Sequence, residues 1–268
     1  MAPTDYVHGY SGIENARLLD QANTLAELLH QDTFFPAHGR VLEAGCGIGA
    51  QTLILAEKCP QTHFTSVDVS PDSIAIAQAS IAQKGYRNVD FGVANIFELP
   101  FGADRFDAIF VCFVLEHLHQ PLAALSQLKA VLKPGGTITV IEGDHASAYF
   151  YPESQAAQRA IDCLVRLQAG MGGNALIGRQ LYPLLHRAGF SQIRVSPRQV
   201  YVDASRPEWV EGFTRNTFTA MVAGAKEQAL AQGLVDLETW EQAMADLYAT
   251  AGEDGTFNYT FFKGIAVK

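Results

Sequence analysis

A glycine-rich segment near the start of the chain carries residue types that could hold a nucleotide-like ligand. It reads Glu43-Ala44-Gly45-Cys46-Gly47-Ile48-Gly49-Ala50, follows an expected strand and begins an expected helix. Glycines let the backbone turn tightly and approach a ligand, and a helix start offers free N–H groups to a negative group. Gly45, Gly47 and Ala50 satisfy the dinucleotide fingerprint G-x-G-x-x-G/A, and Asp68 lies 23 residues after Gly45, where a ribose-binding acid belongs. On this motif alone, a nicotinamide-dependent enzyme fits too.

Short β-branched runs alternate with helical stretches around this segment. Strands are expected over residues 40–44, 63–69, 89–93, 106–113 and 137–142, and later ones over residues 192–202 and 256–267. Ser70-Pro71-Asp72 is typical of a helix start, whereas Lys133-Pro134-Gly135-Gly136 predicts a turn after a helix. Because strands and helices alternate, we expect parallel pairing with right-handed crossovers, which makes an open α/β sheet.

The whole chain, residues 1–268, is expected to form one domain. Its core would comprise residues of about 37–144, 176–202 and 256–268. The remaining segments, residues 1–36, 145–175 and 203–255, would be additions that form a helical lid.

Composition limits the classes of protein to consider. The chain has 48% hydrophobic and 18% charged residues, which is a globular composition. Its net charge of −9 disfavours a nucleic-acid binder that neutralises phosphates. No apolar run approaches the roughly 18 residues of a membrane span, and no signal peptide is evident, so a soluble, cytoplasmic protein is expected. The cysteines are too far apart in sequence for a zinc knuckle, and no metal site is expected.

Five motifs together distinguish between the cofactor classes. Glu43 and the three glycines also spell E-x-G-x-G-x-G. The other motifs are Val67-Asp68-Val69-Ser70, Asn95 to Phe101, Val114-Leu115-Glu116-His117 and Leu132 to Gly136. Together they resemble the class I S-adenosylmethionine (SAM) dependent methyltransferases over about residues 41–142, most closely a quinone-biosynthesis-like, small-molecule subgroup. The resemblance implies a Rossmann-like, doubly wound, seven-stranded sheet that is mostly parallel, with an antiparallel last strand.

The resemblance also implies a cofactor site for SAM, with S-adenosylhomocysteine as product. Gly45 and Gly47 would lie against the methionine moiety, and Asp68 would accept hydrogen bonds from both ribose hydroxyls. The adenine edge would meet the Asn95 side chain and the Ile96 backbone N–H, although the family more usually has aspartate at the Asn95 position. The full expected set is Glu43, Gly45, Cys46, Gly47, Asp68, Val69, Asn95, Ile96 and Cys112, with Glu43 acting through the loop and the Cys112 backbone facing the amino group.

Candidates for chemistry on the acceptor follow the fourth and fifth expected strands. His117 and His145 are the catalytic candidates, and Glu142 and Asp144 lie in the same region. Substrate contacts are expected from Tyr10, Arg17, Tyr149 and Arg179, of which an arginine could hold a carboxylate acceptor. The residues leave open whether an oxygen, nitrogen, sulfur or carbon atom is methylated.

The predicted function is transfer of a methyl group from SAM to a small-molecule metabolite. Two alternatives stay open: a SAM-binding protein with other or no chemistry, and a nicotinamide-dependent oxidoreductase. A homodimer through residues 207–251 is a further hypothesis, resting on Trp209, Phe213, Phe218, Met221 and Trp240.

Overall fold

The computed structural model describes residues 12–268, with side chains from Arg17 onward. These residues cluster into two compact units. The first, here called the helical unit, contains residues 12–28, Gly143–Leu176 and Pro197–Phe261. The second, here called the sheet unit, contains Leu29–Glu142, Ile177–Ser196 and Phe262–Lys268. Each is described by itself, and the expectation of a single domain stays a prediction.

The strands form one seven-stranded sheet of order β3-β2-β1-β4-β5-β7-β6. The strands are β1 (Arg40–Ala44), β2 (His63–Asp68), β3 (Val89–Val93), β4 (Phe106–Cys112), β5 (Leu132–Tyr151), β6 (Ser191–Val202) and β7 (Thr256–Val267). The pairs β1–β2, β1–β4, β2–β3 and β4–β5 are parallel. β7 runs antiparallel to β5, since Gly135 and Gly136 exchange backbone hydrogen bonds with Lys268, whereas Ser147 is bonded to Thr260. The predicted fold class is confirmed.

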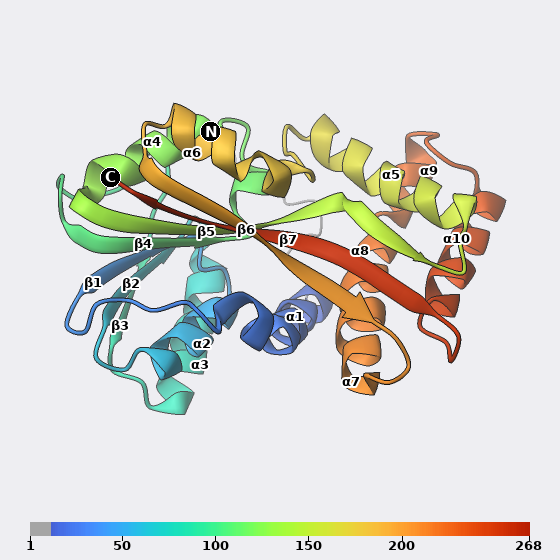
Figure 1. Cartoon of the computed structure of the whole chain (residues 1–268), viewed down its shortest axis with the longest axis horizontal. Coiled ribbons are helices and arrows are strands. Elements are labelled where there is room, and N and C mark those ends of the chain that lie inside the picture. The colour runs from blue at the N-terminus through green and yellow to red at the C-terminus, as the bar shows by residue number, and fades with distance from the viewer. Residues whose placement is uncertain (1–11) are drawn as a thin grey trace. The chain divides into compact units, whose positions relative to one another are not determined.

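Helices connect these strands. They are α1 (Gly12–His30), α2 (Ala50–Lys58), α3 (Pro71–Lys84), η1 (Leu115–His117), α4 (Pro121–Val131), α5 (Gln155–Gly170), η2 (Ile177–Gln180), α6 (Leu181–Arg187), α7 (Pro207–Trp209), η3 (Val210–Thr219), α8 (Ala220–Ala223), α9 (Lys226–Ala231) and α10 (Leu237–Ala249). In the sheet unit, α2 and α3 cover one face of the sheet and α4 and α6 the other (Figure 1). This arrangement is the doubly wound architecture that strand–helix alternation predicts.

The start and end of α3 follow from local sequence. The Ser70 hydroxyl caps the helix by accepting a hydrogen bond from the Ser73 N–H at 3.2 Å, and Pro71 occupies the first turn. Gly85 ends the helix in the left-handed region at φ 75°. An N-terminal serine cap, an early proline and a terminal glycine are the sequence signals of helix boundaries, and here all of them are used.

The apolar core of the sheet unit lies between the sheet and the helices. Its members are wholly or almost wholly buried and come from strands, α4 and α6, as illustrated by Leu42, Ile109, Leu128, Ile138 and Leu185. Burying such side chains contributes about 1.5–3 kcal/mol each to folding. The core therefore fixes the strand ends on which the loops of the site are mounted.

One strand differs from expectation. β5 begins at Leu132 and continues to Tyr151, whereas a strand over residues 137–142 and a preceding turn were expected. Lys133-Pro134-Gly135-Gly136 is part of β5 because Gly135 and Gly136 pair with Lys268 at the end of the chain. Local turn propensity is overridden here by long-range pairing. The segment from His145 to Tyr151, expected as part of the lid, continues the same strand.

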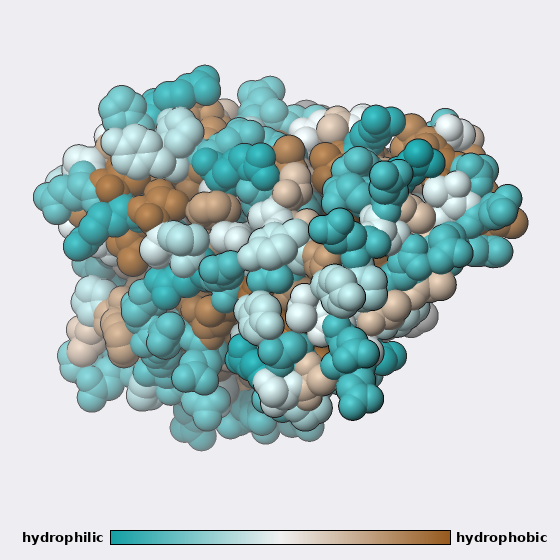
Figure 2. Space-filling view, turned by 45° about the vertical axis from the view of Figure 1, so that its right-hand side comes forward, coloured by the Kyte–Doolittle hydropathy of each residue, from teal (hydrophilic) through white to brown (hydrophobic). Residues whose placement is uncertain are grey.

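Aromatic side chains form the interior of the helical unit. Phe213 and Phe218, both in the π-helical segment η3, pack on Phe257 and Tyr259 of β7 with ring centroids 4.7–6.1 Å apart. Phe213, Phe218, Met221 and Trp240 are all buried inside the unit, and so they are not available as an interface. Trp209 is half-buried, so the homodimer hypothesis keeps one of its five residues and stays a prediction. On the face seen in Figure 2, hydrophobic residues appear in small groups among hydrophilic ones.

A buried polar cluster joins the end of α1 to β7 in the sheet unit. The Lys263 ammonium is fully buried and donates to the Leu29 carbonyl at 3.0 Å, to the Asp32 carboxylate at 2.7 Å and to the Thr33 hydroxyl at 2.6 Å. Beside it, His30 Nε2 lies 2.7 Å from Gln51 Oε1. Burial lowers the pKa of His30 to about 4, and Lys263 contributes in the same direction. His30 is therefore neutral in the folded chain at pH 7.

This cluster predicts how stability depends on pH. Because the folded pKa of His30 is below its unfolded value of 6.5, the unfolded chain binds the proton first, and stability falls as the pH drops from 6.5 towards 4. Between pH 7 and pH 5, the wild type should lose about 2 kcal/mol more unfolding free energy than a His30→Gln variant. Urea unfolding at both pH values measures the difference.

His119 is exposed and provides a matched control, since His119→Gln should follow the wild type. Equal losses in the wild type and in His30→Gln would contradict the assignment of this pH dependence to His30.

Candidate functional site

The glycine-rich loop between β1 and α2 is held in place by β2. The N–H groups of Gly45 and Cys46 both donate to the Val67 carbonyl, at 2.8 and 3.0 Å. Gly45 has φ 82° and Gly47 has φ 51°, the left-handed region that glycine adopts without a steric penalty. The loop thus turns directly at the carboxyl ends of β1 and β2.

The two glycines differ in what surrounds them. A Cβ on Gly45 would lie 2.4 Å from a γ-carbon of Val114, so this glycine allows the loop after β4 to pack against the glycine loop. A Cβ on Gly47 would meet no atom within 4 Å. The space over Gly47 is therefore open on the side where a ligand would approach.

Asp68, the last residue of β2, faces this loop. Its Oδ2 accepts a hydrogen bond from the Gly47 N–H and its Oδ1 accepts one from the Ser70 N–H, both at 2.9 Å. A carboxylate oxygen has a second lone pair, so each oxygen can accept one more hydrogen bond. Val69 follows Asp68, and Val93 pairs with Asp68 across β2 and β3; 48% of Val69 and 54% of Val93 are exposed to solvent. The arrangement suits a ligand with a diol and a flat apolar group.

Glu43 lies beneath the loop. It is buried, and its Oε2 accepts hydrogen bonds from the Thr52 hydroxyl at 2.7 Å and the Ser66 hydroxyl at 2.6 Å. Burial raises the pKa of Glu43 to about 7, the charge of Asp68 adds to the rise, and the two hydroxyls oppose it. These contacts tie the start of α2 to β2, so Glu43 acts on the site through the loop.

Asn95 and Ile96 follow β3 in a tight turn. The Asn95 Oδ1 accepts from the Phe97 N–H at 3.0 Å, and its backbone carbonyl accepts from the Glu98 N–H at 2.9 Å. The side chain is exposed, and Ile96 is half-buried. Asn95 therefore shapes the turn and keeps a free lone pair on its oxygen.

A buried carboxyl group holds the loop after β4. Glu142, on β5, is 0% exposed, and its Oε1 accepts from the N–H groups of Val114 at 3.1 Å and Leu115 at 2.7 Å. Its Oε2 is buried and has no hydrogen-bond partner among the described residues. The sequence makes Glu142 a candidate base near the strand ends, but it does not predict this anchoring contact, because the partners lie 27 and 28 residues away in the chain.

His117 ends η1, the short helix that Glu142 anchors. Its Nε2 lies 3.6 Å from Glu116 Oε1, and 23% of its side chain is exposed. Glu116 itself is buried. Cys112, just before this loop, is also buried, and its backbone ends β4. His117 therefore combines a carboxylate neighbour with partial access to solvent.

The other described candidates for acceptor binding are divided between the two units. In the helical unit, His145 is buried with its Nδ1 2.7 Å from the Tyr259 hydroxyl. Arg17 is buried and donates to Gln21 Oε1 at 3.1 Å, and the exposed Tyr149 accepts from Gln199. Arg179 is an exposed residue of η2 in the sheet unit. Tyr10 lies outside the described residues.

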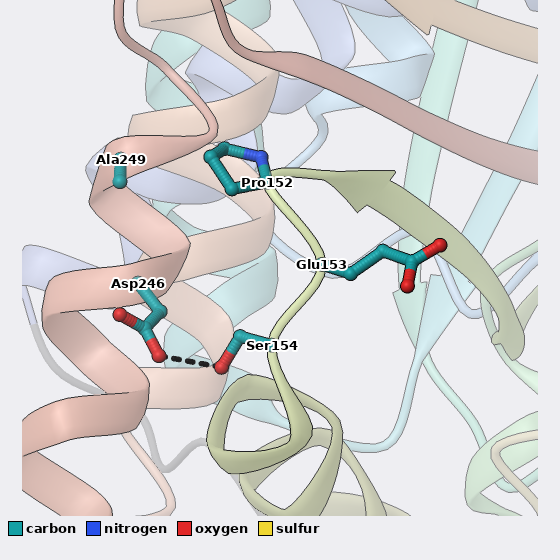
Figure 3. A pocket seen from close by; sticks show the side chains of 5 residues that line it. All are labelled: Pro152, Glu153, Ser154, Asp246 and Ala249. Carbon is teal, nitrogen blue, oxygen red and sulfur yellow. Dashed lines mark hydrogen bonds between the residues drawn. The ribbon is translucent and has the colours of Figure 1, made fainter.

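A shallow cavity of about 210 Å³ opens in the helical unit at the start of α5. It is lined by Pro152, Glu153, Ser154, Asp246 and Ala249, and Figure 3 shows the Ser154 hydroxyl bonded to Asp246. None of the predicted site residues lines it. Within residues 12–268, no group of three or more His, Cys, Asp or Glu side chains could hold a metal ion, and no helix has the length and apolar character needed to cross a membrane.

Comparison with known proteins identifies the class. A family model described as a methyltransferase domain matches residues 36–189, more than half of the chain. The chain is 31% identical over 148 residues to an uncharacterized methyltransferase of Schizosaccharomyces pombe, covering 53% of each protein. It is 30% identical over 115 residues to a demethylmenaquinone methyltransferase of Lactococcus lactis, covering 42% of this chain and 46% of that protein. The chain spans about half the length of the curated relatives it matches.

A solved structure supports the fold over nearly the whole chain. Phosphoethanolamine N-methyltransferase 2 of Haemonchus contortus, solved with phosphomonomethylethanolamine and S-adenosylhomocysteine, superposes with a TM-score of 0.60 at 18% identity. The superposition covers 99% of this chain and 59% of that one. The fold and the family match are those of class I SAM-dependent methyltransferases. The chain belongs to the methyltransferase domain family, as its motifs predicted.

Proposed function

We propose that the chain transfers a methyl group from SAM to a small-molecule acceptor. The observation that carries the proposal is the pairing of an open space over Gly47 with a carboxylate, Asp68, that keeps two lone pairs free. A cofactor with a ribose diol and an amino-acid arm fits this pair. The demethylmenaquinone methyltransferase among the relatives supports a small-molecule acceptor.

The residues of the sheet unit can be assigned to parts of this cofactor. Asp68 would accept hydrogen bonds from both ribose hydroxyls, and Gly45, Cys46 and Gly47 would lie along the methionine arm. The exposed side chain of Val69 would pack on the adenine ring, which would cover apolar surface that is now open to water. The remaining members of the expected set are Asn95 and Ile96 at the adenine edge, Cys112 at the amino group and Glu43 beneath the loop.

When bound, SAM supplies an electrophilic methyl group on a sulfonium. Methyl transfer is an in-line displacement, so the protein accelerates it chiefly by aligning the acceptor and excluding water. An acceptor that arrives protonated needs a base, and we assign this role to His117, whose imidazole is partly exposed beside Glu116. An acceptor that arrives as a carboxylate needs none. Arg17, Tyr149, Arg179, Tyr10 and His145 remain proposed acceptor contacts.

Calorimetry separates this proposal from its main rivals. S-adenosylhomocysteine should bind to the purified chain, whereas NAD should not. Binding of NAD in preference would favour the oxidoreductase and overturn the assignment of Gly47 and Asp68. A SAM-binding protein without methyl-transfer chemistry would bind S-adenosylhomocysteine but transfer no methyl group to any acceptor.

His117 provides a separate test of the chemistry. Replacing His117 with alanine should lower the rate of methyl transfer to a protonated acceptor by about 100-fold or more, because general-base catalysis is worth that much. Affinity for S-adenosylhomocysteine should stay unchanged. The rate of label transfer from methyl-labelled SAM, together with calorimetry, measures both quantities.

His119 is exposed, two residues further along, and His119→Ala is the matched control with an expected normal rate. A His117→Ala variant with a normal rate on a protonated acceptor would remove His117 as the base.

A further inference from the structure

Glu142 is a buried acid with one satisfied oxygen and one unsatisfied one. Its Oε1 accepts hydrogen bonds from the backbone N–H groups of Val114 and Leu115. Its Oε2 is buried and has no hydrogen-bond partner within the described part of the chain. A buried carboxylate oxygen left without a donor costs free energy on the order of 1–3 kcal/mol, more for a charged group. The unliganded fold therefore contains a buried carboxyl oxygen without a hydrogen-bond partner among the described residues.

This position adjoins the glycine loop. Val114, whose N–H binds Glu142, is the residue whose side chain packs on Gly45. The thiol of Cys112 provides a second link, because burial and then the charge of Glu142 raise its pKa, and Glu43 and Glu116 add smaller effects. Glu142 thus lies close to Gly45 and Cys112, the two residues proposed to flank the amino-acid arm of the cofactor.

The charged groups around Glu142 are predominantly acidic. Glu116 on η1 is the charged group that acts on it most directly, and His117 follows on the same helix. Lys263 on β7 is the cation whose charge lowers the pKa of Cys112. Its ammonium donates a hydrogen bond to the Asp32 carboxylate. Burial first, and then the charge of Glu116, raises the pKa of Glu142 well above its ordinary value, while the backbone N–H groups of Leu115, Val114 and Glu116 oppose the rise. Burial of the carboxyl group thus favours the neutral, protonated form of Glu142 before a ligand binds.

We propose that Glu142 is the receptor for the α-ammonium group of the cofactor, and that cofactor binding drives one proton from Glu142 into solvent. The proton balance is simple. The neutral carboxyl group of the free protein and the ammonium of the free cofactor become a carboxylate–ammonium pair, and the carboxyl proton goes to buffer. The unpartnered Oε2 then receives a charged N–H donor, which forms a stronger hydrogen bond than a neutral one.

The inference rests on the proposed function, and it predicts a dependence of cofactor affinity on pH. Below the pKa of Glu142 in the unliganded protein, affinity should rise by up to tenfold per pH unit, because binding requires the loss of about one proton. Above that pKa, affinity should level off. A ligand without the ammonium should show neither effect.

Isothermal titration calorimetry at pH 7, in two buffers with different ionisation enthalpies, counts the protons. S-adenosylhomocysteine is the probe, since it carries the ammonium without the sulfonium charge. 5′-Methylthioadenosine, which has the adenosine and thioether but no amino-acid arm, is the control ligand. We expect release of about one proton with S-adenosylhomocysteine and of none with 5′-methylthioadenosine.

Variants assign the proton to a residue. Glu142→Gln keeps an oxygen for Val114 and Leu115, so it should bind S-adenosylhomocysteine about tenfold more weakly and without proton release. Glu43→Gln should still release the proton. The exposed Glu57 gives the matched charge control, and Glu57→Gln should behave as the wild type.

The outcomes separate the inference from the proposed function. If neither ligand binds, both the function and the inference are overturned. If S-adenosylhomocysteine binds without proton release, or if 5′-methylthioadenosine releases an equal number of protons, the inference alone is overturned. Proton release that persists in the Glu142→Gln variant, or that disappears in the Glu43→Gln variant, also overturns the inference. Should Glu142→Gln fail to fold, the comparison of the two ligands on the wild type still decides.

Discussion

An Asp68→Ala variant should bind S-adenosylhomocysteine about 100-fold more weakly than the wild type, or worse. Two hydrogen bonds from ribose hydroxyls to a carboxylate contribute about 1.5–3 kcal/mol each, and every 1.4 kcal/mol is about a tenfold change in affinity. The substitution also removes the acceptor of the Gly47 N–H, so the glycine loop loses one of its anchors. Calorimetric titration of both proteins measures the loss.

Two further variants show whether the carboxylate itself is responsible. Asp68→Asn keeps the shape but lacks the charge and one acceptor, so its affinity should fall between those of the wild type and Asp68→Ala. Asp72 is exposed in the first turn of α3, four residues away, and Asp72→Asn should bind normally. Affinity of Asp68→Ala within a few-fold of the wild type would rule out Asp68 as the ribose acid.

Gly47→Ala should have the second large effect, and it should affect binding more than folding. The new methyl group meets no protein atom within 4 Å, so it enters the space that we assign to the cofactor. The left-handed φ of 51° adds a steric cost of about 1–2 kcal/mol to the folded state. We therefore expect a modest loss of stability together with at least about a tenfold loss of affinity, equivalent to 1.4 kcal/mol.

Gly85 provides the matched control for Gly47. It ends α3 with φ 75°, and a Cβ there would also meet no atom within 4 Å. Gly85→Ala should lose a similar amount of unfolding free energy in urea while its affinity for S-adenosylhomocysteine stays normal. Equal affinities in the two variants would show that the space over Gly47 is not where the cofactor binds.

Much of the sheet unit is predictable because its signals are local. β1 and β3 have the expected bounds, since Gly45 closes β1 and β3 lies between Gly85, which ends α3, and the turn at Asn95. The boundary error in β5 has a different origin. Its first residues have turn propensity, but their hydrogen bonds go to Lys268, more than 130 residues away, and no local pattern contains that information.

The same contrast applies to the site. Gly45, Gly47 and Asp68 belong to contiguous motifs whose spacing reflects a loop between two strands, and the structure brings them together as expected. Glu142 acquires its place from the backbone of Val114 and Leu115, a tertiary contact without a sequence motif. His145 was expected just after the fifth strand; it lies within β5 and contacts Tyr259, a residue 114 positions further along the chain.

The central claim is methyl transfer from SAM to a small molecule, and one experiment tests it directly. The purified chain is incubated with SAM that carries a radiolabelled methyl group and with an extract of the source cells. The products are then separated into metabolites and macromolecules. We expect label in the metabolite fraction with the wild type and none with Asp68→Ala, and the labelled compound identifies the acceptor. Label in protein or RNA would contradict the proposed substrate class, and absence of transfer to any fraction would contradict methyl transfer itself.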